Sequence, residues 1–126
     1  MRIIIDSAEL YSRKVGGAAV ISIHGSFLVG EVAKLQNLFN HHKHEGVQDF
    51  IVDLENTRLL QSHVIGQLLV IIQDITKSGG RICLVKPTER VRFVLNLTRV
   101  SELVPVYDSM QEAIEAFSLP AEGLET

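Results

Sequence analysis

The chain has 126 residues, of which 46% are hydrophobic and 21% are charged, and its formal net charge at pH 7 is −3. This apolar content is enough for the core of one domain, expected over residues 1–118, with a flexible tail at 119–126. The net charge is small, and Lys and Arg are spread along the chain, so the protein has no positive electrostatic field that would attract nucleic acid or an anionic membrane. The expected partner is therefore a protein or a small molecule.

The first third of the chain predicts two strands and a helix. Extended runs at 2–14 and 18–24 are separated by a Gly-Gly pair at 16–17, which favours a β-hairpin. The residues at 25–27 are expected to end the second strand. Apolar residues then recur at intervals of three and four, which predicts an amphipathic helix over 29–44.

The middle of the chain predicts a strand that leads into a helix. Residues 50–54 form an apolar, largely β-branched run, and a polar turn is expected at 55–58. The spacing of apolar residues then predicts a helix over 62–77. Ser62 stands at the join, where its side-chain oxygen is expected to cap the free N–H groups of the first helical turn.

The last third predicts two more strands and two more helices. Strands are expected at 81–85 and 104–107, a helix at 89–98 capped by Thr88, and a helix at 109–117 that opens on a Ser-x-x-Glu capping box. Strands separated by single helices form βαβ units. The predicted fold is therefore α/β, with a mixed β-sheet, an N-terminal hairpin and about four helices.

This order of elements, together with the central motif, resembles the STAS domain (sulfate transporter and anti-sigma factor antagonist) family, specifically its free-standing anti-anti-sigma factors. The family's motif reads approximately V-D-L-S-x-V-x-x-I-D-S-S-G-L-G-x-L-L. In the same register, without a gap, this chain has V-D-L-E at 52–55 and L-Q-S-H-V-I-G-Q-L-L at 60–69. The resemblance covers residues 9–117 and implies a STAS-like fold.

The resemblance also implies a switch protein that is not an enzyme and needs no cofactor. Family members bind an anti-sigma factor that is also a serine kinase, and so free a sigma factor for transcription. Phosphorylation of the first serine of D-S-S-G prevents this binding, and a serine phosphatase restores it. Ser62 occupies that position and is the candidate phosphoacceptor. A phosphate there would add about −1.5 to −2 charges, which a helix N-terminus tolerates.

Three of the four D-S-S-G positions differ from the family's motif, since Gln61, His63 and Val64 replace Asp, Ser and Gly. Gln61 lacks the carboxylate's charge, and the bulk of Val64 is expected to hinder the approach of a kinase. Two roles are therefore open for Ser62, namely the phosphoacceptor of a switch or a plain helix N-cap.

The partner-binding surface is expected at the start of the central helix, beside the loop after the second strand. Phe27, an aromatic residue in an otherwise polar turn, is a contact anchor in this hypothesis, and a core residue under the first helix in the alternative. The predicted surface comprises Ser26, Phe27, Gln61, Ser62, His63, Gly66 and Gln67.

Other candidate sites are weaker. His41, His42 and His44 lie close together, but adjacent positions on a helix point about 100° apart, so no metal site is expected. The single cysteine, Cys83, is expected to be a reduced thiol in the core. The apolar run at 68–72 is too short to cross a bilayer, and the chain is expected to be cytoplasmic.

Three functions remain open at this point. The first is an anti-sigma factor antagonist controlled by phosphorylation of Ser62. The second is a non-phosphorylated STAS scaffold, or the cytoplasmic subunit of a transport complex. The third is a small-molecule or nucleotide sensor that uses the surface around Ser62.

Overall fold

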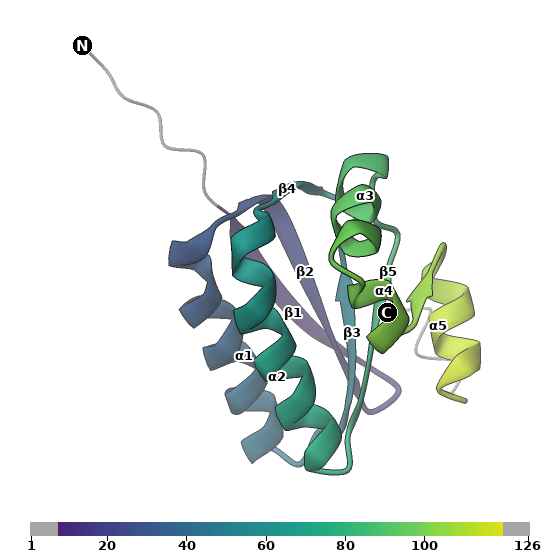
Figure 1. Cartoon of the computed structure of the whole chain (residues 1–126). Helices are drawn as coiled ribbons and strands as arrows, with labels where there is room; N and C mark the ends of the chain where they lie inside the picture. The colour runs from purple at the N-terminus through teal and green to yellow at the C-terminus, as the bar shows by residue number, and fades with distance from the viewer. Residues whose placement is uncertain (1–7, 120–126) are drawn as a thin grey trace.

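The computed structural model describes residues 8–119, which form a six-stranded mixed sheet with helices on both faces (Figure 1). Five strands follow one another across the sheet in the order β1 (Glu9–Val15), β2 (Ala18–Phe27), β3 (Asp49–Asp53), β5 (Arg81–Val85) and β6 (Val106–Tyr107), and β4 (Thr57–Leu60) pairs with the end of β2. The predicted α/β class with a mixed sheet is confirmed. The first seven residues and most of the predicted tail, 120–126, lie outside the described residues. The helices are α1 (Val32–His44), α2 (Ile65–Lys77), α3 (Glu89–Leu97), α4 (Val100–Leu103) and α5 (Met110–Ala116).

The N-terminal hairpin is present as predicted, with β1 antiparallel to β2. Its turn uses Gly16 and Gly17 at φ of 57° and 89°, a backbone region that side chains other than glycine rarely enter. The predicted end of the second strand is wrong, because β2 continues through Ser26 and Phe27. The pairing register shifts between Gly25 and Ser26, so the strand bends at this point and does not stop.

One strand, β4, lies where the sequence predicts a polar turn at 55–58. Its residues pair in parallel with the end of β2, from Gly25 to Phe27. Thr57 is fully buried and its hydroxyl donates a hydrogen bond to the carbonyl oxygen of Ile23, at 2.7 Å. A contact with a strand 34 positions earlier along the chain therefore decides the structure of this segment.

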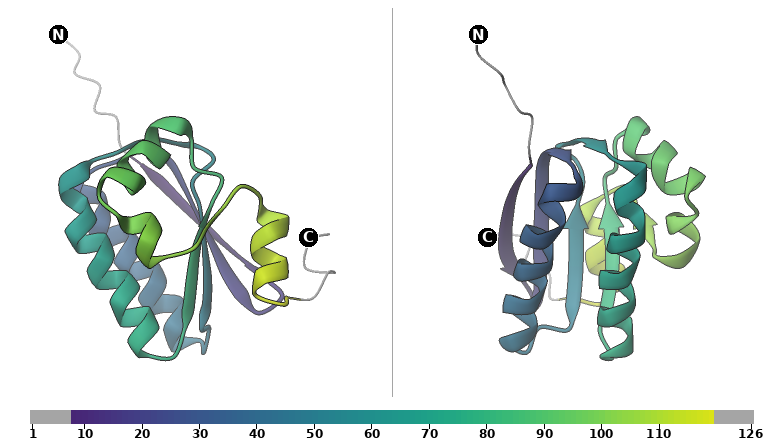
Figure 2. Two further views of the ribbon diagram at one scale, coloured as in Figure 1. Left: turned by 45° about the vertical axis from the view of Figure 1, so that its right-hand side comes forward. Right: turned by 60° about the vertical axis from the view of Figure 1, so that its left-hand side comes forward.

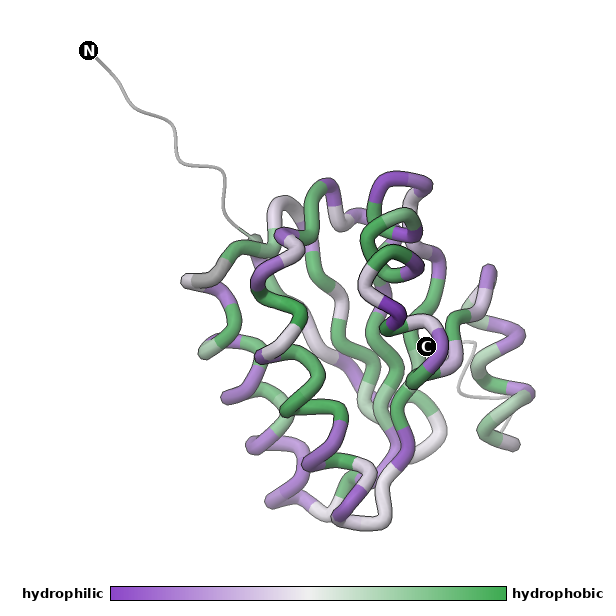
Figure 3. Tube along the Cα trace, viewed as in Figure 1, coloured by the Kyte–Doolittle hydropathy of each residue, from purple (hydrophilic) through white to green (hydrophobic). Residues whose placement is uncertain are grey.

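Helices cover the two faces of the sheet unequally. Figures 1 and 2 show α1 and α2 side by side on one face and α5 on the other. Successive strand residues alternate between two cores, since Ile21, Val52 and Leu84 belong to the larger cluster, on the α1 and α2 side, and Ile51 and Cys83 to the smaller one. The central strands β3 and β5 are accordingly largely hydrophobic in Figure 3.

The helices begin and end close to the predicted positions. Thr88 accepts a hydrogen bond from the N–H of Val91 at 3.2 Å, and Ser109 caps α5 through the N–H of Glu112 at 3.1 Å. The short α4 was not predicted. Arg99, at φ of 62°, separates it from α3. Within residues 8–119, none of the helices is long and apolar enough to span a membrane.

Candidate functional site

The segment that joins β4 to α2 places Ser62 on the surface. Gln61 is extended, at φ −67° and ψ 132°, and a 3-10 turn over Ser62–Val64 precedes the helix proper, which begins at Ile65. Neither the turn nor α2 has a side-chain cap, and the Ser62 hydroxyl has no hydrogen-bond partner among the described residues. The prediction that Ser62 caps the helix is wrong, because Ser62 lies within the 3-10 turn and the α-helix begins three residues later, at Ile65.

Four of the predicted partner-binding residues form one exposed cluster. Ser62, His63, Gly66 and Gln67 are all exposed, and Gln61 beside them is half-buried. Residues three and four apart on a helix are surface neighbours, so these side chains share one face at the N-terminus of α2. A Cβ added at Gly66 would meet nothing within 4 Å, which means that the backbone is directly accessible there.

Ser26 and Phe27 lie beside this cluster but beneath the surface. The N–H of Gln61 donates to the carbonyl oxygen of Phe27 at 3.3 Å, so the end of β2 supports the start of the turn. The side chains of Ser26 and Phe27 are only 4% and 1% exposed. The anchor role expected for Phe27 is therefore corrected, because its ring belongs to the core, as the alternative prediction had it.

Val64 also departs from its expected role. Its side chain is 0% exposed and is part of the larger core cluster. The expected steric hindrance to a kinase is wrong, because this side chain points into the protein and leaves the surface at Ser62 open. The valine instead fixes the 3-10 turn to the core.

Charged residues near the ends of β3 and β5 are paired with one another. Lys86 donates to a carboxylate oxygen of Glu55 at 2.8 Å, and this hydrogen bond lowers the pKa of Glu55 and raises the pKa of Lys86. Asp53 accepts a hydrogen bond from the N–H of Glu55 at 3.0 Å, which closes the turn after β3. Both carboxylates thus have structural partners.

Sequence reasoning missed an exposed apolar pair on α3. Phe93 and Leu97 are 66% and 67% exposed and stand four residues apart, on the side of the helix opposite to the buried Val91 and Leu95. The helix packs beside β4, at the end of the sheet where α2 begins (Figure 1). The available signal was the presence of apolar residues on two opposite sides of one short helix.

The histidines and the cysteine singled out in the sequence lie apart from this surface. The rings of His41 and His42 are 5.3 Å apart, and both lie within 4 Å of Glu45, but the described residues contain no group of three or more ligands suited to a metal ion. Cys83 is free and fully buried, and burial raises the pKa of its thiol to about 12. Such a thiol is a core residue, as predicted.

The chain matches known proteins over most of its length. The model of the STAS domain family matches residues 10–113. A protein of Thermotoga maritima, assigned by name as an anti-sigma factor antagonist, is 32% identical over 78 residues, which are 62% of this chain and 69% of that protein.

Solved structures show the same fold. A crystal structure of a Thermotoga maritima protein assigned as an anti-sigma factor antagonist has a TM-score of 0.74 and 23% identity, over 85% of this chain and 92% of that one. The anti-sigma factor antagonist SpoIIAA in its unphosphorylated form has a TM-score of 0.74 and 19% identity, over 87% and 96%. The phosphorylated form of SpoIIAA, a Bacillus cell fate determinant, has a TM-score of 0.66 and 18% identity, over 86% and 99%. With the family model matching residues 10–113, the chain belongs to the STAS domain family.

Proposed function

We propose that this protein is an anti-sigma factor antagonist that works by partner switching, and that Ser62 is its phosphoacceptor. The observation that carries the proposal is the exposed hydroxyl of Ser62 at the N-terminal end of α2, in the register of the family's phosphorylated serine. The names of the Thermotoga relative and of SpoIIAA support the antagonist role, and the phosphorylated form of SpoIIAA supports the switch. Such a protein acts in the cytoplasm without being an enzyme.

The proposed contact surface consists of Gln61, Ser62, His63, Gly66 and Gln67, with Ser26 and Phe27 supporting it from beneath. The partner is an anti-sigma factor that also acts as a serine kinase, and a serine phosphatase reverses the modification.

An apolar anchor for this surface comes from the pair on α3. Contact surfaces usually depend on a few large side chains that become fully desolvated. Phe27 is buried and is unavailable for this purpose, whereas Phe93 and Leu97 are exposed on α3, which packs beside β4. We therefore include this pair in the proposed contact surface.

Phosphorylation of Ser62 is expected to leave the fold intact and to prevent binding. The N–H groups at the start of a helix and the helix dipole favour an anion, so the phosphate is tolerated in the free protein. In a closely packed interface the same charge would have to be desolvated without a counter-ion, at a cost of several kcal/mol. Binding should then weaken by orders of magnitude, since about 1.4 kcal/mol corresponds to a factor of ten.

The test combines three serine variants with the anti-sigma factor of the same organism. Ser62→Ala should bind as the unmodified protein does, whereas Ser62→Asp should bind at least about a hundredfold more weakly. Ser12→Asp, at an exposed serine of β1, is the matched control for charge alone and should bind normally. Intact-mass measurement after incubation with the kinase and ATP should detect one phosphate on the unmodified protein and none on Ser62→Ala. Normal binding by Ser62→Asp refutes the switch.

One observation favours a second candidate function, a STAS scaffold or transport-complex subunit that is not phosphorylated. Gln61 and His63 replace the acidic and serine neighbours of the phosphoacceptor in the family's motif. Under this alternative the kinase leaves Ser62 unmodified, while substitutions of His63 and Gln67 still weaken binding of a partner. The mass measurement distinguishes the two candidates directly.

A further inference from the structure

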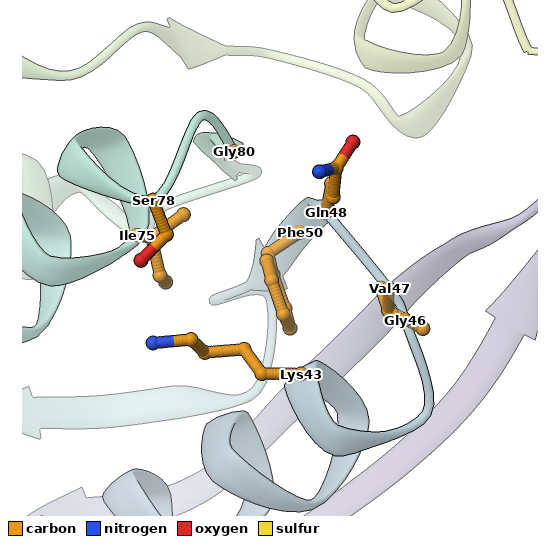
Figure 4. A pocket seen from close by; sticks show the side chains of 8 residues that line it. All are labelled: Lys43, Gly46, Val47, Gln48, Phe50, Ile75, Ser78 and Gly80. Atoms are coloured by element: carbon orange, nitrogen blue, oxygen red, sulfur yellow. The ribbon is translucent and has the colours of Figure 1, made fainter.

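A pocket lies at the end of the molecule opposite to Ser62, between the last turns of α1 and α2. Its volume is about 160 Å³. The lining side chains come from three segments (Figure 4). These are Lys43 of α1, then Val47 and Gln48 of the loop before β3 with Phe50 of β3 itself, and finally Ile75 of α2 with Ser78 just after that helix. The whole length of α2 separates this pocket from the proposed partner-binding surface.

The floor of the pocket consists of buried apolar side chains that pack against the core. Phe50, Ile75 and Val47 are 1%, 2% and 7% exposed, and Phe39 packs edge-on against the Phe50 ring at 5.0 Å between centroids. A volume of about 150 Å³ lined by such side chains is known to hold a benzene-sized molecule. The pocket therefore has room for one aromatic ring or a short hydrocarbon chain.

Gly80 closes one side of the pocket by a very close approach of two backbones. Its N–H donates to the carbonyl oxygen of Ile75 at 2.9 Å, and a Cβ at this position would lie 2.6 Å from the carbonyl oxygen of Gln48. The next residue, Arg81, donates its N–H to the same Gln48 oxygen at 2.8 Å. These contacts hold the turn after α2 against the loop before β3, so backbone hydrogen bonds fix the wall of the pocket.

The mouth of the pocket carries a cation. The side chain of Lys43 extends from α1 toward Ile75 and Ser78 and passes next to the Phe50 ring (Figure 4). Among the described residues, the ammonium of Lys43 has no salt-bridge partner within 4 Å. Lys14 of β1 and the two histidines of α1, His41 and His42, all lie within 4 Å of Glu45 instead. An unpaired cation above an apolar floor suits a ligand with one anionic group and an apolar body.

We propose that this pocket binds a small monocarboxylate whose apolar body has the size of an aromatic ring or a short branched chain. The carboxylate pairs with Lys43 at the mouth, and the hydrocarbon part lies on Phe50 and Ile75. The ligand is small and remains partly open to water, so the dissociation constant should be on the order of 1 mM. This binding site goes beyond the proposed partner switching and does not depend on it.

The probes for the test are benzoate, benzyl alcohol and benzylamine, which share one ring and differ in the charge of the polar group. Each is titrated into the full chain while amide chemical shifts are followed by NMR. Benzoate should produce saturable shifts at Val47, Phe50 and Gly80, and should bind at least about fivefold more tightly than benzyl alcohol, which has no charge to pair with Lys43. Equal or tighter binding of benzyl alcohol or benzylamine overturns the proposal, as do shifts that fail to saturate or that lie elsewhere.

Two lysine variants separate a specific contact from general attraction. Lys43→Gln should reduce the affinity for benzoate to that for benzyl alcohol. Lys77→Gln is the matched control, because Lys77 is the last residue of α2, is exposed, and does not line this pocket. Benzoate should bind to it as to the unmodified protein. An equal loss of affinity in both variants means general electrostatic attraction and refutes the assigned role of Lys43.

Discussion

The hydrogen bond of Thr57 to Ile23 offers a direct test of how β4 is held in place. Thr57→Val keeps the shape of the side chain but removes the hydroxyl, so the carbonyl oxygen of Ile23 loses this donor at a site that is 0% exposed. Leaving a buried acceptor without its donor costs about 1–3 kcal/mol. The methyl group that replaces the hydroxyl adds apolar burial worth about 0.8 kcal/mol. The free energy of unfolding should therefore fall by up to about 2 kcal/mol.

Urea denaturation of three variants measures this contribution. Thr57→Ser keeps the hydroxyl and loses one buried methyl group, so it should lose about 1 kcal/mol through packing alone. Thr76→Val is the matched control, because Thr76 also donates its hydroxyl to a backbone carbonyl, at 2.9 Å, but is exposed on α2. It should change stability by less than about 0.5 kcal/mol.

Hydrogen exchange adds a local readout at the same position. The N–H of Gln61 donates to Phe27 at the end of the β4 pairing, so its exchange should become faster in Thr57→Val than in Thr76→Val. A Thr57→Val variant that is as stable as Thr76→Val, with unchanged exchange at Gln61, would show that the hydroxyl does not hold β4.

Four further outcomes follow from single residues. Gly80→Ala should destabilise the protein by more than about 1 kcal/mol, because the added Cβ would clash with the carbonyl oxygen of Gln48. Gly66→Ala should stabilise it by up to about 1 kcal/mol, because the added Cβ lies in open space in the first turn of α2. Urea denaturation measures both changes. Cys83 should not react with a thiol reagent at pH 8 until the protein is unfolded, because its buried thiol has a pKa of about 12. The pKa of Glu55 is lower in the folded protein than its ordinary value of 4.5, so its ion pair stabilises the fold above pH 4.5 and less as the pH falls through the folded pKa. Glu55→Gln should accordingly be less stable than the unmodified protein at pH 7, and thermal melts should find this difference reduced at pH 3.

The elements that the sequence predicted correctly have local causes. The hairpin depends on two glycines that adopt positive φ, and α3 and α5 begin at side chains that cap their own first turns. The spacing of apolar residues in α1 and α2 reflects one buried face of each helix. Such signals lie within a few residues of the structure that they specify, so they can be read without the rest of the fold.

The errors share the opposite cause, a contact between distant parts of the chain. Thr57 and Arg58 are polar and suggest a turn, yet Thr57 is buried because β2 supplies both its strand partner and its hydrogen-bond acceptor. Phe27 looks like an exposed aromatic residue because Gly25 and Ser26 precede it, yet β2 continues and carries its ring into the core. Neither burial is encoded in the residues next to it.

The displacement of the helix start changes what Ser62 does. A capping serine contributes about 0.5–2 kcal/mol to stability, so its removal would affect folding and binding together. Here the Ser62 hydroxyl bonds to none of the described residues, and the core residue Val64 fixes the turn instead. Substitution of Ser62 should therefore change stability by less than about 0.5 kcal/mol, as expected for an exposed side chain without such a role. Stability and partner binding are separable at this position, so any loss of binding in Ser62→Asp reports on the interface alone.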